Sequence, residues 1–153
     1  MTYKSLPEYG LYATATVCRL LPITRRRLAH YVQMGLIQLR KQRPGSGNSY
    51  MFSPLNVLEA AVLDEIQDLG VIAARIKPGV PAICSALREF ATAPKSYRAI
   101  VGSMLLIKMT DEGYEAWITA ALRPRSTGIY LNLEKTAIRV ADILKKHNAK
   151  QKY

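Results

Sequence analysis

Apolar residues recur at helical spacing in the first part of the chain, and one break interrupts them. Before the break, the apolar stripe consists of Val17, Leu20 and Leu21. The hydroxyl of Thr14 or Thr16 can cap this first helix. Pro22 then stops the pattern, because proline cannot continue a helix interior. We therefore expect a helix that begins near residue 14 and ends before Pro22.

A second helix follows directly after this break. Thr24 can cap its first turn, and Leu28 and Tyr31 form its apolar face. Gly35 suits the left-handed conformation in which many helices end, so this helix should run to about Met34. The pattern predicts a helix, a tight turn and a second helix.

The next stretch has the pattern of two short strands around a polar loop. Residues 36–39 are mostly apolar, residues 40–48 are basic and rich in turn-forming residues, and residues 50–52 return as a short apolar strand. This order predicts a hairpin with a basic tip, which we call the wing.

Two more helices are expected before Pro94. Ser53 caps the first of them and Pro54 takes its first position. Its buried stripe should consist of Leu55, Leu58, Val62, Ile66 and Leu69. The second should cover residues 81–91 and pack its apolar face against the first. That face consists of Ile83, Leu87 and Phe90.

Beyond residue 97 the pattern changes from helix to strand. Residues 100–109 and 114–120 predict two strands joined by a turn, and residues 129–133 predict a third. Aromatic residues at alternating strand positions, such as Tyr114 and Trp117, are more typical of a core or interface than of a ligand pocket.

The last predicted element is a helix that begins near Asn132 or Leu133. Its apolar stripe should consist of Leu133, Ala137, Ile138, Ala141 and Leu144. The predicted fold class is therefore α+β. A winged helix-turn-helix domain with trailing helices is expected over 1–94, and a small β-β-β-α domain with a basic tail over 95–153.

The positive charge is concentrated on the N-terminal helices and the wing. The 153-residue chain has a formal net charge of +11, and no acidic residue lies between Glu8 and Glu59. That window contains the basic residues Arg19, Arg25, Arg26, Arg27, Arg40, Lys41 and Arg43. A polyanionic partner explains this surface better than a solvated basic face does, because each neutralised phosphate releases counterions.

Residues 12–70 resemble the winged-helix DNA-binding domain of the MerR family. The shared features are the aliphatic first helix, the turn at 22–24, Leu28 and Tyr31 followed by 34–37, the glycine-containing wing, Phe52–Ser53 and Leu69–Gly70. The chain has Ala29 and Tyr50 where the family commonly has arginine. It also lacks apolar heptads after Gly70, whereas typical members continue into a long coiled coil. The resemblance implies a DNA-binding module and, for a complete member, activation by distortion of promoter DNA.

The predicted DNA-binding residues belong to the second helix and the wing. They are Thr24, Arg25, Arg26, Arg27, His30, Arg40, Lys41, Arg43, Asn48 and Ser49. We expect Arg25 and Arg26 to read bases and Arg27 to face phosphate, since successive helical residues point about 100° apart. An arginine that bonds both acceptors of guanine discriminates between bases by roughly 1–3 kcal/mol. The basic residues of the wing should touch phosphates or enter the minor groove.

The C-terminal half suggests partners rather than chemistry. After Gly70 the chain has 14 lysines and arginines against 6 acidic residues. This excess fits a second DNA contact, an acidic protein partner such as a polymerase subunit, or a solvated tail. Three strands and one helix make a thin core, and small cores of this kind often pair with another copy. We therefore expect a homodimer formed through this half.

No pattern in the sequence points to an enzyme. It contains no phosphate-cradling glycine loop, no cluster with metal-ligand spacing and no histidine-acid-nucleophile set, so we expect no catalytic residue, metal or cofactor. Cys18 and Cys84 lie far apart in apolar contexts and are expected to be free thiols. Without a membrane span or secretory signal, the protein is expected in the cytoplasm of a bacterium or phage-infected cell, on the nucleoid through DNA binding.

Three functions are compatible with these patterns. The first is a sequence-specific transcription regulator that binds a two-fold-related DNA site as a dimer. The second is an architectural recombination factor of the excisionase type, which would bind adjacent repeats and bend DNA. The third is a protein-interaction module such as an antitoxin or antiactivator.

Overall fold

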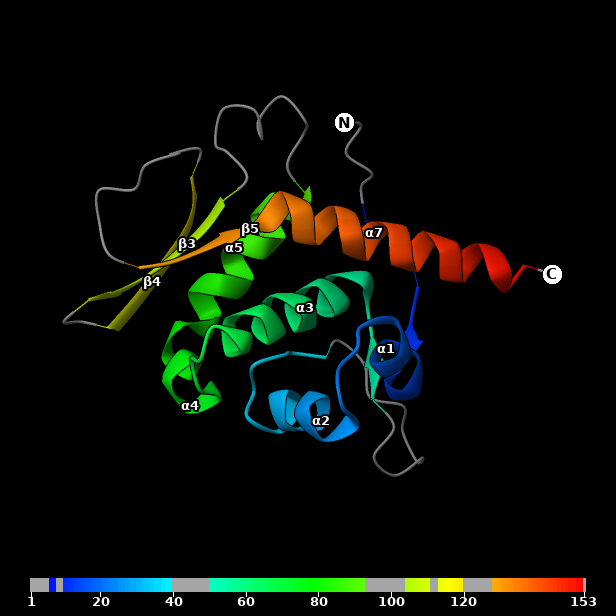
Figure 1. Ribbon diagram of the computed structural model, residues 1–153, viewed down its shortest axis with the longest axis horizontal. Helices are drawn as coiled ribbons and strands as arrows, with labels where there is room; N and C mark the ends of the chain where they lie inside the picture. Colours follow the sequence, from blue (N-terminus) through cyan, green and yellow to red (C-terminus); the bar gives the residue numbers. More distant parts are fainter. Residues whose placement is uncertain are drawn as a thin grey trace.

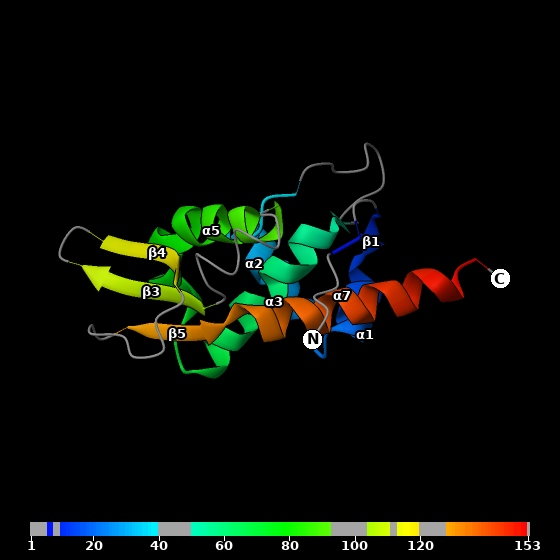
Figure 2. The ribbon, with the colours of Figure 1, turned by 90° about the horizontal axis from the view of Figure 1, so that it is seen from above.

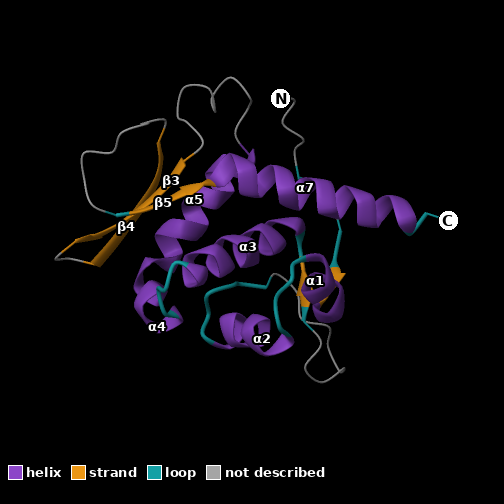
Figure 3. Cartoon of the chain, viewed as in Figure 1, coloured by secondary structure: helices purple, strands orange, loops and turns teal. Residues whose placement is uncertain are grey.

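The protein has a mixed α+β architecture with two small antiparallel sheets, and this confirms the predicted fold class at that level (Figure 1). The computed structural model describes residues 6–7, 10–39, 50–92, 104–110, 113–119 and 128–152. Among these residues, no helix has both the length and the apolar character needed to cross a membrane. Helices make up most of the molecule, and the larger sheet lies at one end of it (Figure 3).

The two N-terminal helices form where the apolar pattern predicts them. Helix α1 covers Thr14–Leu20 and helix α2 covers Arg25–Gln33. Gly35 has a φ of 73°, which is the left-handed conformation expected after α2. The predicted cap of α1 is wrong. Its N-cap is Ala13, whose extended backbone also belongs to strand β1 (Tyr12–Ala13), so the Thr14 hydroxyl lies inside the helix.

The predicted wing strand at residues 36–39 is not formed. Leu36 and Ile37 are buried in bends that follow α2, where the Leu36 backbone N–H donates to the Tyr31 carbonyl over 2.9 Å. Strand β2 (Met51–Phe52) pairs instead with β1, with Tyr12 opposite Phe52. Packing explains the difference, because both apolar residues of the expected strand are needed in the core beneath α2.

Helix α3 (Pro54–Asp68) is the central element of the fold. Ser53 caps it as predicted, and a reciprocal bond with Asn56 completes a capping box. The predicted apolar stripe underestimates its burial, because Glu59 and the polar Asn56 are also buried. Figure 1 shows α3 between α2 on one side and α7 (Leu133–Lys150) on the other. The predicted stripe is wrong at its end, since Leu69 is 61% exposed beside Gly70.

A short connection leads from α3 to the next long helix. Helix α4 (Ala73–Ile76) and the 3-10 turn η1 (Lys77–Gly79) take up the break predicted by the prolines and glycine. Helix α5 (Val80–Thr92) then buries the predicted face. It packs against α3, which confirms that expectation, and also against β4 (Gly113–Thr119).

The C-terminal sheet has the predicted antiparallel strands. Its order is β4, β3 (Met104–Thr110) and β5 (Ile129–Asn132), with β3 in the middle. Leu106 pairs with Trp117 on one side and Tyr130 on the other. Gly128 allows β5 to approach β3, because a Cβ there would lie 2.7 Å from the Ile107 carbonyl oxygen. The side chains of Tyr114 and Trp117 lie outside those that the structure describes.

Helix α7 connects the sheet to the N-terminal helices. Asn132 caps it, and its buried stripe contains Val140, whereas the predicted Ile138 is only half-buried. The first part of α7 packs on α3 and β3, and its last turns lie beside the N-terminal segment (Figure 2). There the Tyr12 hydroxyl donates to Asn148 Oδ1 over 3.0 Å.

One hydrophobic core includes residues from both halves of the chain. Val17 and Leu58 belong to the same cluster of buried side chains as Leu105 and Leu144. The C-terminal unit therefore acquires buried surface from its own chain, through α3 and α5. The division at 94/95 stays a prediction, but the thin core on which the homodimer prediction rested is thicker than the sequence suggested.

Candidate nucleic-acid interface

The turn between α1 and α2 is set by three local contacts. Helix α1 closes with the Leu21 backbone N–H on the Val17 carbonyl, and Pro22 follows. Thr24 Oγ1 then accepts the backbone N–H of Arg27 over 3.1 Å, which satisfies one of the unpaired donors at the start of α2. Thr24 is confirmed as a helix cap; its predicted contact with DNA stays a prediction.

Helix α2 buries one narrow face and exposes the opposite one. Leu28 and Tyr31 are 0% and 1% exposed. Arg25, Arg26 and His30 lie on the exposed side. Among the described residues, neither Arg25 nor Arg26 makes an ion pair. Three predicted site residues thus stand together on one accessible helical surface, with two uncompensated guanidinium groups.

A shallow hollow adjoins this surface. It has a volume of about 360 Å³ and is lined by Arg25, Ala29 and Gln33 from α2, together with Thr14 and Tyr50. Gln33 is a candidate contact that the sequence reasoning missed. The signal was present, because Arg25, Ala29 and Gln33 are four residues apart and so share one side of a helix. An amide here could bond adenine through both of its polar atoms.

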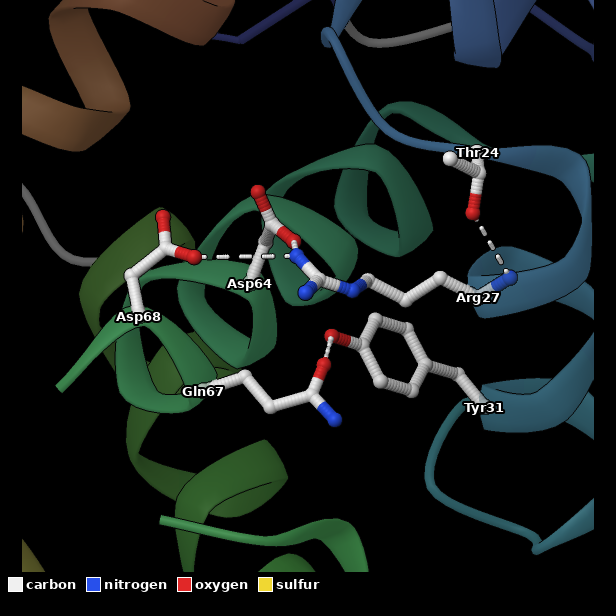
Figure 4. A network of polar contacts seen from close by, with 6 residues as sticks. All are labelled: Thr24, Arg27, Tyr31, Asp64, Gln67 and Asp68. Atoms are coloured by element: carbon white, nitrogen blue, oxygen red, sulfur yellow. Dashed lines mark hydrogen bonds and ion pairs between the residues drawn. The ribbon is translucent and has the colours of Figure 1, made fainter. Parts of the chain in front are cut away.

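Arg27 points away from this surface, toward α3. Its Nη1 lies 2.5 Å from Asp64 Oδ1 and 3.6 Å from Asp68 Oδ1, and its side chain is 39% exposed (Figure 4). The hydrogen bond to Asp64 raises the pKa of Arg27 above its ordinary value. Two carboxylates thus compensate its charge. The predicted phosphate contact of Arg27 stays a prediction, and the observed contact is with α3.

A second bond beside this ion pair joins the same two helices. The Tyr31 hydroxyl donates to Gln67 Oε1 over 2.6 Å, and both side chains lie next to Arg27 in Figure 4. Burial, followed by the charge of Asp64, raises the pKa of the Tyr31 hydroxyl, so it remains a donor at neutral pH. We call the contacts of Arg27 and Tyr31 with Asp64, Gln67 and Asp68 the α2–α3 seam.

The predicted wing residues Arg40, Lys41, Arg43, Asn48 and Ser49 lie outside the described residues. The chain on either side of them is anchored, since Leu39 and Tyr50 both pack against the hydrophobic core. Ten residues connect these two anchors, and three of them are basic.

One basic residue of α1 faces the end of α7. Arg19 Nη2 lies 3.4 Å from His147 Nδ1, and the His147 ring is 5.9 Å from the Tyr12 ring. Lys146, Lys150 and Lys152 are exposed along the same end of α7. The basic tail therefore begins beside α1.

The described residues offer little for catalysis. They contain no group of three or more His, Cys, Asp or Glu side chains that could hold a metal ion. Cys18 and Cys84 are both free and half-buried. Burial raises the pKa of both thiols, that of Cys84 to about 12, so neither is a ready nucleophile at neutral pH.

No protein-family model and no curated protein sequence matches the chain.

Proposed function

We propose that the protein is a sequence-specific DNA-binding transcription regulator that inserts α2 into a major groove. The supporting observation is the division of labour within the arginine triplet. Arg27 is held by α3, while Arg25 and Arg26 remain exposed on the side of α2 opposite its buried face. A short helix fixed along one side and cationic on the other suits a groove lined by phosphates.

The distribution of acidic residues supports the same orientation. In the described N-terminal half they are Glu59, Asp64, Glu65 and Asp68, all on α3. Asp64 and Asp68 face Arg27, and Glu65 contacts Arg139 on α7. The negative charge lies behind α2, so a polyanion approaching the exposed face would meet Arg25 and Arg26 first.

In this proposal Arg25 and Arg26 contact bases, and Gln33 and His30 extend the contact along α2. The basic residues between Leu39 and Tyr50 bind the backbone or minor groove. We carry the homodimer forward as part of the proposal. Two copies would then place their α2 helices about 34–36 Å apart, or at a multiple of that spacing.

Binding to DNA upstream of its own gene tests the proposal, with random DNA as competitor. We expect the native site to win by about 10³-fold or more, and Arg26→Ala to remove that preference. Arg75→Ala, at an exposed position on α4, is the matched control and should leave it unchanged. Equal, weak binding to every sequence by wild type and Arg26→Ala would refute the proposal.

A salt series separates the roles of the three arginines. The logarithm of the binding constant falls with the logarithm of salt concentration by about 0.9 for each phosphate neutralised. A base-reading Arg26 should lose specificity when replaced, with a smaller effect on this slope. Arg27→Ala should leave the slope unchanged, because its charge is already compensated by Asp64. A slope reduced by about one unit would instead support the predicted phosphate contact.

Footprinting then distinguishes the kinds of DNA-binding protein. Two protected half-sites fit the dimeric regulator, whereas a row of adjacent repeats would favour the excisionase type.

A further inference from the structure

A groove lies behind the DNA-facing helix, at the junction of α2, α3 and α5. Its volume is about 740 Å³, which is within the usual range for sites that hold small organic molecules. The last residues of α2, the segment at Gln38 and Leu39, the first turns of α3 and one side of α5 all contribute to its wall.

The wall contains two buried polar side chains. Glu59 is 5% exposed and Asn56 is 4% exposed. Asn56 Nδ2 donates to Glu59 Oε2 over 3.0 Å and to the Gln38 carbonyl over 3.1 Å. Asn56 thus holds the Glu59 carboxylate and the segment after α2 in place at the same time. A carboxylate is costly to bury, so its presence in the wall of a groove favours a role in binding.

Cationic and apolar groups complete the lining. Lys77 and Arg88 are exposed at the groove, whereas Leu39 and Leu55 are half-buried in it. Cys84 lies between the two kinds of charge, because Glu59 raises the pKa of its thiol and Arg88 lowers it. The groove therefore presents a negative group in its wall, positive groups at its mouth and an aliphatic surface between them.

We propose that this groove binds a small zwitterion of amino-acid or dipeptide size. Its ammonium group lies against Glu59, its carboxylate against Arg88 or Lys77, and its carbon chain against Leu39 and Leu55. Such a molecule would satisfy both charges at once, and charge-assisted hydrogen bonds are the stronger ones.

Occupation of the groove would reach the DNA-facing surface directly. Gln33 and Gly35 line both the groove and the end of α2, and Asn56 ties Gln38 to α3. A ligand that bridges α2 to α5 would fix the angle at which α2 is presented. This regulatory part rests on the proposed function, whereas ligand binding itself does not.

The test is a titration of the isotope-labelled full-length protein, without DNA, followed by NMR. The probes are the common amino acids and the dipeptides that each forms with alanine. At least one should bind saturably and shift the signals of Gln38, Leu55 and Cys84. Its N-acetyl and carboxamide derivatives, which each lack one charge, should bind about tenfold more weakly or less.

Variants assign the charges. Arg88→Ala should weaken the zwitterion by about tenfold but leave its carboxamide unaffected, and Glu59→Gln should weaken both. Glu89→Gln, a neighbouring position on the exposed side of α5, is the control and should change neither affinity. Arg88 is exposed, so its variant remains informative if Glu59→Gln fails to fold.

Three results would overturn the site: no saturable binding from any probe, signal shifts elsewhere in the molecule, or affinities that ignore Arg88. If a probe binds the groove but leaves DNA affinity unchanged, the binding site stands and the regulatory part is refuted. Failure to bind DNA at all would refute the proposed function while the NMR titration remains readable.

Discussion

Helices α2 and α7 lie on opposite sides of α3, and they are held there in different ways. Helix α2 buries only Leu28 and Tyr31, so the polar α2–α3 seam makes up much of its contact. Helix α7 buries six residues and adds a smaller polar contact, in which Glu65 Oε1 accepts from Thr136 Oγ1 over 2.8 Å and from Arg139 over 3.1 Å.

The difference indicates which helix has an adjustable position. Apolar packing over a long stripe fixes α7 firmly, since interiors are close-packed and resist displacement. Helix α2 depends on a few oriented polar bonds, which set its angle as well as its distance from α3. A helix that must fit a DNA groove benefits from this arrangement, because its outer face stays free of packing residues.

The largest expected effect comes from the packed side. Leu144→Ala should lower the free energy of unfolding by about 2–5 kcal/mol, because Leu144 is fully buried within the core shared by both halves. Chemical denaturation measures it, with Leu11→Ala, 58% exposed, as the control. A loss below about 0.5 kcal/mol would show that α7 lies outside the cooperative core.

The next effect concerns the Tyr31 hydroxyl in the α2–α3 seam. Tyr31→Phe should cost about 0.5–1.5 kcal/mol near neutral pH, because Gln67 loses its donor. The raised pKa of Tyr31 means that its contribution is complete below the unfolded value of about 10 and is lost as pH rises further. Denaturation at increasing pH should therefore show the gap between wild type and variant closing above about pH 10. A gap that stays constant would contradict the buried position of the hydroxyl.

Arg27→Gln should have a smaller effect on stability and a larger one on function. The side chain is 39% exposed, so breaking the ion pair should cost at most about 1 kcal/mol. Specific DNA affinity should nevertheless fall, because α2 loses the bond that orients it. Arg27→Lys should restore it only partly, since lysine lacks the planar fork of donors. Full affinity in Arg27→Gln would mean that the seam does not position α2.

The smallest effect is expected on the α7 side. Arg139→Gln should change the free energy of unfolding by about 0.2–1 kcal/mol and leave DNA affinity unaltered, because the ion pair is partly exposed and the apolar stripe remains. Denaturation and DNA titration of this variant beside Arg27→Gln compare the two sides of α3 directly. Equal losses of DNA affinity would remove the distinction between them.

Local sequence signals were sufficient for most elements. Thr24 and Ser53 cap their helices, Pro22 ends the first helical pattern, and Gly35 adopts the left-handed conformation after α2. The strand hairpin and the final helix also begin and end near the predicted residues. These features depend on neighbours within a few positions, so the sequence states them openly.

For the candidate site, the sequence located the helix but not the direction of each side chain. It separated the buried Leu28 and Tyr31 from the arginines, yet it gave no means of assigning Arg27 to α3. That assignment needs Asp64 and Asp68, which lie about ten helical turns' worth of residues further along the chain and meet Arg27 only through folding. Gln33 was overlooked although its spacing from Arg25 was visible.

The sequence by itself determined the helices, strands and their caps, and the gathering of positive charge in a window without acids. The tertiary structure decided the partner of β2, the orientation of Arg27, the groove beside Glu59 and the packing of α7 across α3. The physical reason is range: caps and periodicity act between near neighbours, whereas pairing, ion pairs and core packing join residues that only the folded chain brings together.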